Sequence, residues 1–171
     1  MWWLRLGDLL RFRLPRHDQM FVKSYLNEAG LFLFNQMSVA DQAHSVRVAR
    51  YIIEERAAGK DLNLDCLVQA ALLHDVGKVK GEIGRINRIV VGIIRRFFPR
   101  KRDQWARRDK TSAFRYALYV DAIHPSRGGY MAESMGIDPQ VVTLIKKHHD
   151  PDSAADDTLE LSLLKLADAK S

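Results

Sequence analysis

The sequence places ionisable side chains on helix stripes that are otherwise apolar. His44 falls on a stripe with Val48 and Ile52, and His74 falls four positions after Ala70. Residues three, four and seven apart share one face of a helix, so both imidazoles are expected to point into a core. Five side chains follow this pattern: His44, His74, Asp75, His148 and Asp168. Buried carboxylates need partners, and histidines that converge with carboxylates in a helical bundle are what a metal site requires.

Five of the six histidines fall beside a turn or on a stripe that also carries an acid: His44, His74, His124, His148 and His149. Taken singly, each has a simpler interpretation. An inward histidine is more often a hydrogen-bonded core residue than a ligand, and a histidine near a helix C-terminus is favourable as a cation. Asp168 alone would suit a cap or an arginine partner. The coincidence of all these residues favours a metal site, and only His17, in a basic linker, is given no role.

A short motif and its spacing resemble a known family. The string LLHDVGK, a histidine thirty positions before His74 and an aspartate in the last helix are similar to the HD-domain metal-dependent phosphohydrolases. The family pattern of a His, a His-Asp pair and a distal Asp fits His44, His74–Asp75 and Asp168. The resemblance runs from about Ser38 to the C-terminus and leaves residues 1–37 uncovered. It implies an all-α fold and hydrolysis by a metal-activated water.

Members of the family that hold two metals have further histidines, and three histidines of this chain stand where those would be. The resemblance implies one metal held by His44, His74, Asp75 and Asp168, and a second held by His124, His148 and His149, with Asp75 as the bridge. Imidazole and carboxylate without thiolate suit iron, manganese, cobalt, nickel or zinc. The resemblance to bimetal members favours iron or manganese, as divalent ions. Cys66 is expected to be a small buried apolar residue.

The resemblance implies a nucleotide-like phosphoester or phosphodiester as the substrate. In HPSRGGYMAES, Met131 follows Gly129-Tyr130 where the subgroup that cleaves cyclic di-guanylate has a proline, so that substrate is not predicted. Members that open other cyclic dinucleotides, or that hydrolyse dinucleoside polyphosphates, are closer. Lys78 is expected to donate a hydrogen bond or a proton to the phosphate, as the family's lysine does, and Arg127, in a turn, is a second phosphate contact. A solvated lysine and a solvated arginine are the alternatives.

Two other functions stay open on the same scaffold. One is a di-iron oxygenase, and the other is a non-catalytic signalling module that binds a nucleotide. Clustered basic residues and Lys78 favour phosphate chemistry.

The net charge of +6 is concentrated in two segments. Residues 85–110 hold ten Lys or Arg against two Asp, and residues 1–16 hold four Arg against one Asp. Such clusters favour a local anionic partner, either a phosphate-bearing small molecule or an acidic membrane surface, and we expect no nucleic acid. Oligomeric state is not predicted.

The basic segment 85–110 also contains a strong apolar stretch, which leaves three interpretations. It is a lid over the phosphate site, a peripheral membrane contact, or a packed helix with a solvated basic face. We favour the last, with Phe97 and Phe98 in the core and with solvent around most of five cations: Arg95, Arg96, Arg100, Lys101 and Arg102. Trp2 and Trp3 lie among the arginines of 1–16 and also have two interpretations. They anchor the chain at a membrane interface, or they pack on the surface of the core.

The composition describes the domain that must position these residues. The chain has 171 residues, of which 47% are hydrophobic and 28% charged, which is typical of one soluble globular domain. One cysteine excludes a disulfide framework and a thiolate zinc site. No apolar run is long enough to cross a bilayer and the N-terminus does not resemble a signal peptide, so we expect a cytoplasmic protein.

Helical periodicity dominates, and it predicts an all-α bundle of about seven helices. Ser38 with Asp41, and Asn63, are expected to cap two of them, and Asp138-Pro139 to start another. The turn His124-Pro125-Ser126 is expected to separate two helices. The expected helical segments are 18–37, 38–58, 64–76, 112–123, 126–136, 138–149 and 157–171, and apolar and arginine residues mix over 83–98, up to Pro99. We interpret residues 1–37 as a helical extension packed on an HD-type domain, residues 38–171.

Overall fold

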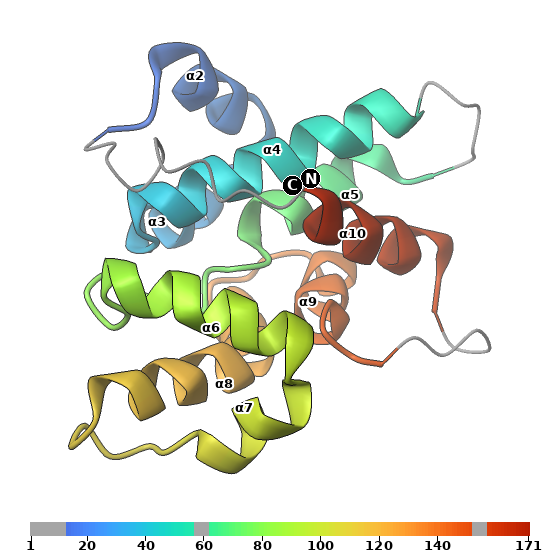
Figure 1. The fold of residues 1–171 in the computed structure, drawn as a ribbon. Helices are drawn as coiled ribbons and strands as arrows, with labels where there is room; N and C mark the ends of the chain where they lie inside the picture. Colours follow the sequence, from blue (N-terminus) through green and yellow to red (C-terminus); the bar gives the residue numbers. More distant parts are fainter. Residues whose placement is uncertain (1–12, 57–61, 152–156) are drawn as a thin grey trace.

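The computed structural model describes residues 13–56, 62–151 and 157–171 (Figure 1). Within them the fold is all-α, as predicted, and the single β-bridge joins Met37 to Val79. The helices are α2 (Arg16–Tyr25), α3 (Glu28–Gln36), α4 (Val39–Arg56), α5 (Leu64–Leu73), α6 (Arg85–Phe97), α7 (Pro99–Trp105), α8 (Ala113–Ser134), α9 (Pro139–Lys147) and α10 (Leu159–Lys170). None of the described helices is long and apolar enough to cross a membrane.

Side-chain caps fix the start of several helices. Ser38 Oγ accepts a hydrogen bond from the backbone N–H of Asp41 at 3.3 Å, and Asn63 accepts one from Cys66 at 3.3 Å. Asp138 caps α9 through the N–H of Gln140 at 2.7 Å. Each bond satisfies an N–H that the first helical turn leaves without a partner. These three predicted helix starts are confirmed.

Helix α5 is the centre of the domain and packs against α2, α3, α4, α9 and α10. Every residue from Leu67 to Leu73 except the polar Gln69 is buried, which fits a helix that is apolar almost all round. Cys66 is buried on this helix, as expected. Burial holds the pKa of its thiol at about 11, which makes it unreactive at neutral pH.

A second, smaller cluster joins α6 to α8, in the lower half of Figure 1. Val91 and Ile94 of α6 pack there on Ala117, Leu118 and Val120. Phe97 and Phe98, by contrast, are 64% and 57% exposed. Their predicted place in the core is therefore wrong, because Val91 and Ile94 already supply the buried side of α6.

Two predicted boundaries also need correction. The expected helix 18–37 is two helices, because Leu26 is extended and Asn27 starts α3 by accepting a hydrogen bond from Gly30. The segment after Pro99 forms the short helix α7 with proline at its first turn. The count of about seven helices was accordingly too low, since the described residues contain nine.

The predicted turn at His124-Pro125-Ser126 is wrong, because α8 continues through it with Pro125 inside the helix. Proline has no N–H, so the carbonyl of Asp121, four residues earlier, loses its helical donor. Nδ1 of His124 lies 2.6 Å from that carbonyl oxygen and takes the place of the missing N–H. The helix is thus kept, and the ring of His124 is fixed.

Candidate metal centre

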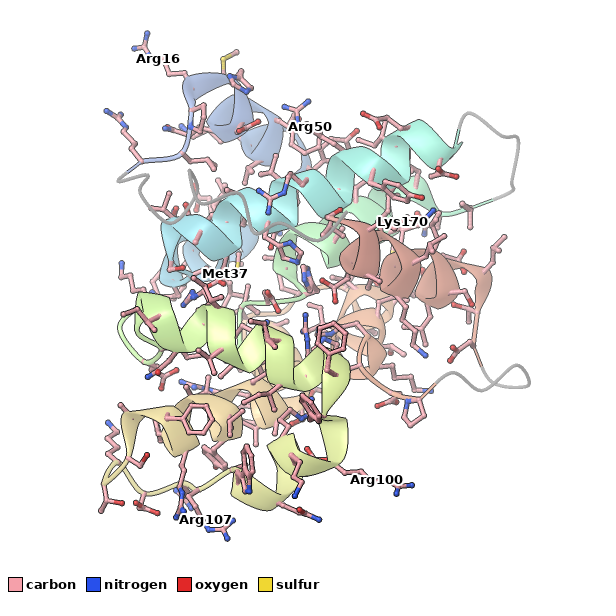
Figure 2. All side chains as sticks on the ribbon, in the orientation of Figure 1. Arg16, Met37, Arg50, Arg100, Arg107 and Lys170 are labelled. Atoms are coloured by element: carbon pink, nitrogen blue, oxygen red, sulfur yellow. The ribbon has the colours of Figure 1, made fainter. Side chains whose placement is uncertain are left out.

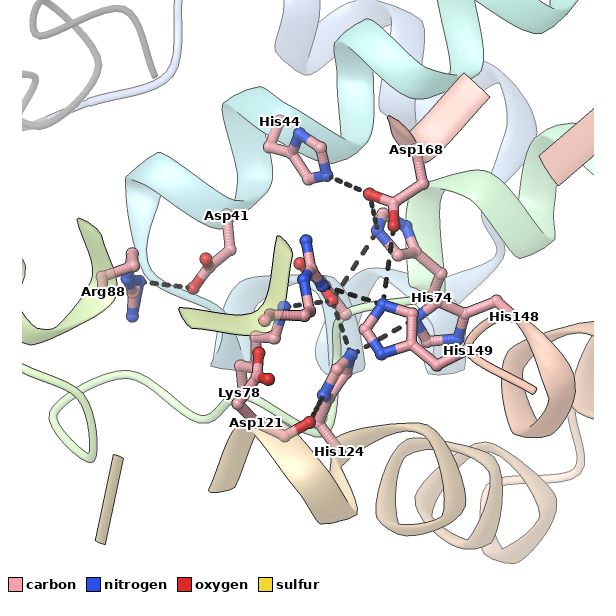
Figure 3. Close-up of polar contacts among 12 residues, drawn as sticks. Asp41, His44, His74, Lys78, Arg88, Asp121, His124, His148, His149 and Asp168 are labelled. Carbon is pink, nitrogen blue, oxygen red and sulfur yellow. Dashed lines mark hydrogen bonds and ion pairs between the residues drawn. The ribbon is translucent and has the colours of Figure 1, made fainter. Parts of the chain in front are cut away.

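The structure brings together all seven predicted metal ligands (Figure 3). They come from α4, the end of α5, the middle of α8, the end of α9 and the last turn of α10. Two groups have ligand atoms within 4.8 Å of one another and could each hold a metal ion: His44, His74 and Asp75, and His124, His148 and His149. These are the two groups that the resemblance implied, with Asp168 as the seventh residue.

Asp168 closes the first group. Its Oδ1 lies 2.8 Å from Nε2 of His44 and 3.6 Å from Nε2 of His74. Nε2 of His74 is buried and has no hydrogen-bond partner among the described residues, although it also lies 3.7 Å from Oδ1 of Asp75. A buried nitrogen without a partner is costly, and a cation between these atoms would satisfy it.

The two carboxylates connect the first group to the second. Oδ1 of Asp75 lies 3.1 Å from Nε2 of His124, and Oδ2 of Asp168 lies 3.5 Å from Nε2 of His149. Asp75 therefore lies beside one histidine of each group and could serve as a ligand to both.

Three histidines are oriented in the same way, by a bond from Nδ1 to a backbone carbonyl three residues earlier. His74 uses Ala71 at 2.8 Å, His124 uses Asp121 and His148 uses Ile145 at 2.8 Å. His74 and His148 end α5 and α9, where carbonyls have no helical donor, and Pro125 creates the same situation in α8. A carbonyl only accepts, so each Nδ1 carries a proton and Nε2 of each ring faces the centre, with a free lone pair wherever the ring is neutral.

This orientation tests whether the residues fit a metal. Nε2 of His124 and Nε2 of His148 are 3.2 Å apart, and in the neutral rings both atoms carry lone pairs. Two acceptors facing each other repel, whereas a cation bound by both turns the contact into an attraction. The donor set contains imidazole and carboxylate and suits a first-row transition metal. The residues therefore fit a metal centre.

The protonation states also suit metal ligands. Burial lowers the pKa of His124 to about 3, and burial with the neighbouring histidines lowers the pKa of His148 well below its usual value. Burial opposes ionisation of Asp75 and Asp168, but their cationic and hydrogen-bonding partners outweigh it and hold both pKa values well below the usual range. Burial likewise opposes the charged form of His74, and Asp75 and Asp168 outweigh it and raise its pKa. At neutral pH the centre thus offers neutral His124 and His148 with ionised carboxylates, as metal binding requires.

Lys78 lies at the edge of this centre. Its side chain is buried and Nζ is 2.8 Å from Oδ1 of Asp75. The alternative of a solvated lysine at a helix end is therefore excluded.

Sequence reasoning missed Arg95, which it assigned to a solvated face. The side chain is mostly buried, and Nη1 donates to Nε2 of His149 at 2.8 Å. Burial opposes its charge, but Asp168, Asp121 and Asp75 outweigh that effect and raise the pKa of the guanidinium. The sequence does contain one signal for its position: Arg95 follows Arg88 by seven residues, so the two share one face of α6. In the structure this face points inward, because Arg88 pairs with buried Asp41 at 2.8 Å.

Asp121 was also missed. It is buried one turn before His124, and its Oδ2 has no hydrogen-bond partner in the described part of the chain, with Nη1 of Arg102 3.6 Å away. Burial opposes its charge, while Arg95 and Lys78 lower its pKa and keep it ionised. The two residues that were missed, Arg95 and Asp121, thus add one positive and one negative side chain beside the histidines.

Arg127, the second predicted phosphate contact, also pairs with a carboxylate in the structure. It lies within α8 rather than in a turn, and Nη1 donates to Glu82 at 2.7 Å. Its contact with phosphate stays a prediction.

Comparison with protein-family models matches residues 42–171 to the model described as HD domain. All seven residues of the centre fall inside this range, and residues before 42 lie outside it. Comparisons with curated proteins and with solved structures gave no match.

Proposed function

Because the chain belongs to the HD-domain family, whose members are generally hydrolases that bind divalent metals, we propose that it is a metal-dependent phosphohydrolase. Its substrate class is a nucleotide-like phosphoester or phosphodiester. Support comes from one observation above the others: two cations, buried Lys78 and partly buried Arg95, border a set of seven histidines and aspartates able to hold two metal ions.

The proposed ligands divide as the geometry groups them. His44, His74 and Asp168 serve one ion, and His124, His148 and His149 serve the other. Asp75 serves both, since its Oδ1 lies near Nε2 of His74 and of His124. When bound, two divalent ions would stabilise charge on phosphoryl oxygens and lower the pKa of a bound water, so that hydroxide is available near neutral pH to attack phosphorus.

Lys78 acts on the charge that develops during cleavage. Its ammonium is held at the centre by an ion pair with Asp75, with Nζ 2.8 Å from Oδ1, and carries three N–H donors. These donors are available to a phosphoryl or leaving-group oxygen, where a buried donor stabilises charge most strongly.

Arg95 binds and orients the substrate. One of its five N–H donors goes to Nε2 of His149, whose lone pair must be released by Arg95 when it binds a metal ion, and the others are available to phosphate oxygens. Burial opposes the charge of Arg95, but Asp168 and Asp121 outweigh it and raise the pKa of the guanidinium, and Arg95 in turn lowers the pKa of buried Asp121. A centre for neutral substrates has no need of two such cations, and this favours phosphate over the oxygenase alternative.

The experiment uses full-length protein stripped of metal and reconstituted with Mn²⁺ or Fe²⁺. Bis(p-nitrophenyl) phosphate, nucleotides, cyclic dinucleotides and dinucleoside polyphosphates are screened for phosphoester cleavage, and oxygen uptake is followed in parallel. Cleavage that needs added metal and is lost in Asp75→Ala supports the proposal. Oxygen uptake without cleavage would establish the oxygenase instead, and nucleotide binding without turnover would establish the signalling module.

A further inference from the structure

Exposed large apolar side chains are concentrated along α6 and α7. Eleven such side chains are exposed in the described part of the chain, and five of them fall between positions 86 and 105: Ile86, Ile93, Phe97, Phe98 and Trp105. Ile86 is the most exposed, at 77%. We call these five residues the α6–α7 apolar face. Neither the metal centre nor the proposed reaction accounts for it.

The helical geometry of α6 separates this face from the centre. At about 100° per residue, Ile86, Ile93 and Phe97 lie within about 40° of one another around the helix. Arg88 and Arg95, which reach Asp41 and His149, lie on the opposite side, about 180° away. The same helix therefore carries the site on its inner face and an apolar row about 16 Å long on its outer face.

Exposed cations flank the apolar face. Five of them lie on α7 and in the loop that follows: Arg100, Lys101, Arg107, Arg108 and Lys110. Only two acidic residues, Asp103 and Asp109, are interspersed with them. Figure 2 shows Arg100 and Arg107 projecting outward at the end of the molecule formed by α7. The combination of exposed aliphatic and aromatic groups with a surplus of positive charge is typical of a peripheral membrane surface.

We propose that the α6–α7 apolar face docks this protein on an anionic lipid bilayer. The aliphatic and aromatic side chains enter the boundary between headgroups and acyl chains, with Trp105 at the interface, and the five cations contact lipid phosphates. Charge decides between a bilayer and a second copy of the chain. A two-fold contact would bring the same cationic cluster against itself, which is unfavourable, whereas an acidic leaflet is complementary to it. This surface extends the protein's role beyond the proposed hydrolysis and does not depend on it.

The test is sedimentation of the metal-reconstituted, full-length protein with vesicles. Vesicles of 30% phosphatidylglycerol in phosphatidylcholine are compared with pure phosphatidylcholine, at low and high salt. We expect binding to the anionic vesicles only, and loss of that binding at high salt as the Debye length shrinks. The doubly substituted Arg100→Gln/Lys101→Gln should bind about 30-fold more weakly, because each cation near an anionic surface contributes about five-fold.

Matched controls separate this face from the rest of the chain. Lys23→Gln/Lys80→Gln removes the same charge from exposed positions elsewhere, and it should bind within about three-fold of wild type. Ile93→Ser/Phe98→Ser should lose most binding, whereas Met20→Ser/Phe32→Ser, at two other exposed apolar positions, should keep it.

Three results would overturn the proposal. The first is no sedimentation with anionic vesicles at low salt. The second is binding that does not depend on this surface, seen as equal binding to neutral vesicles or as binding that survives both α6–α7 variants. The third is a dimer in analytical ultracentrifugation that Ile93→Ser/Phe98→Ser dissociates, which would show that a second copy covers the face.

Discussion

Substituting Gly77 with alanine should disturb the metal centre without touching a ligand. A Cβ atom at Gly77 would lie 2.2 Å from the carbonyl oxygen of His124 and 2.8 Å from its Cα. Ordinary contact begins at about 3.4 Å, so α8 has to move by roughly 1 Å at the residue that carries a proposed ligand. Both clashing atoms are backbone, which cannot rotate away as a flexible side chain could.

The expected magnitude follows from that displacement. Forcing an extra methyl group into a packed interior costs about 1–3 kcal/mol of unfolding free energy. A shift of about 1 Å at a ligand also weakens a centre whose geometry must hold within about 0.5 Å. Gly77→Ala should therefore lose both stability and metal affinity.

The assay combines urea denaturation with metal analysis after dialysis. Gly92→Ala is the matched control, because a Cβ there meets nothing within 4 Å and alanine is the better helix former. We expect the control to keep its metal and to be as stable as wild type or more so. If Gly77→Ala binds as much metal as wild type and is equally stable, the close approach of Gly77 to α8 is not what positions His124.

Three further predictions test separate parts of the centre. Pro125→Ala restores a backbone N–H that competes with Nδ1 of His124 for the carbonyl of Asp121. Metal affinity, measured by competition with a chelator, should therefore fall about 10-fold, without loss of helix in circular dichroism. Unchanged affinity would show that this hydrogen bond does not orient His124. Lys78→Met should keep its metal and lose about 10²–10³ in turnover, whereas exposed Lys80→Met should match wild type, and equal rates for both would remove Lys78 from the mechanism. In metal-free protein, His124 has its usual pKa of 6.5 in the unfolded chain, whereas burial holds its pKa at about 3 in the folded chain. The unfolded chain therefore takes up the proton, and this residue lowers the free energy of unfolding by about 2 kcal/mol as the pH falls from 7 to 5. His148 acts in the same direction and His74 in the opposite one, and urea denaturation that shows rising stability on acidification would contradict the net effect.

The sequence was most informative where one local rule decides the outcome. Side-chain caps predicted the starts of α4, α5 and α9, because Ser38, Asn63 and Asp138 bind N–H groups two or three residues away. Apolar periodicity predicted that α5 is the central helix and that His74 points into the core. Together with the motif, these signals were enough to nominate seven residues that the fold brings together.

It was least informative where distant residues compete for the same role. Pro125 suggested a turn, but the imidazole of His124 supplies the hydrogen bond that proline removes, and α8 continues. Arg95 was assigned to solvent because its partners, His149 and Asp168, come more than fifty residues later in the chain. Phe97 and Phe98 were placed in the core because hydrophobicity alone does not say which face of α6 meets α8.

The most direct test of the central claim is the metal content of protein purified without added metal and analysed by inductively coupled plasma mass spectrometry. Wild type should carry about two transition-metal ions per chain, and acidification should release them as the ligand histidines take up protons. Asp75→Ala should lose both ions, because its carboxylate lies between the two histidine groups, whereas His148→Ala should retain the ion of the first group better than that of the second. A full complement in Asp75→Ala, or wild-type protein that takes up no transition metal when it is supplied, would contradict the account.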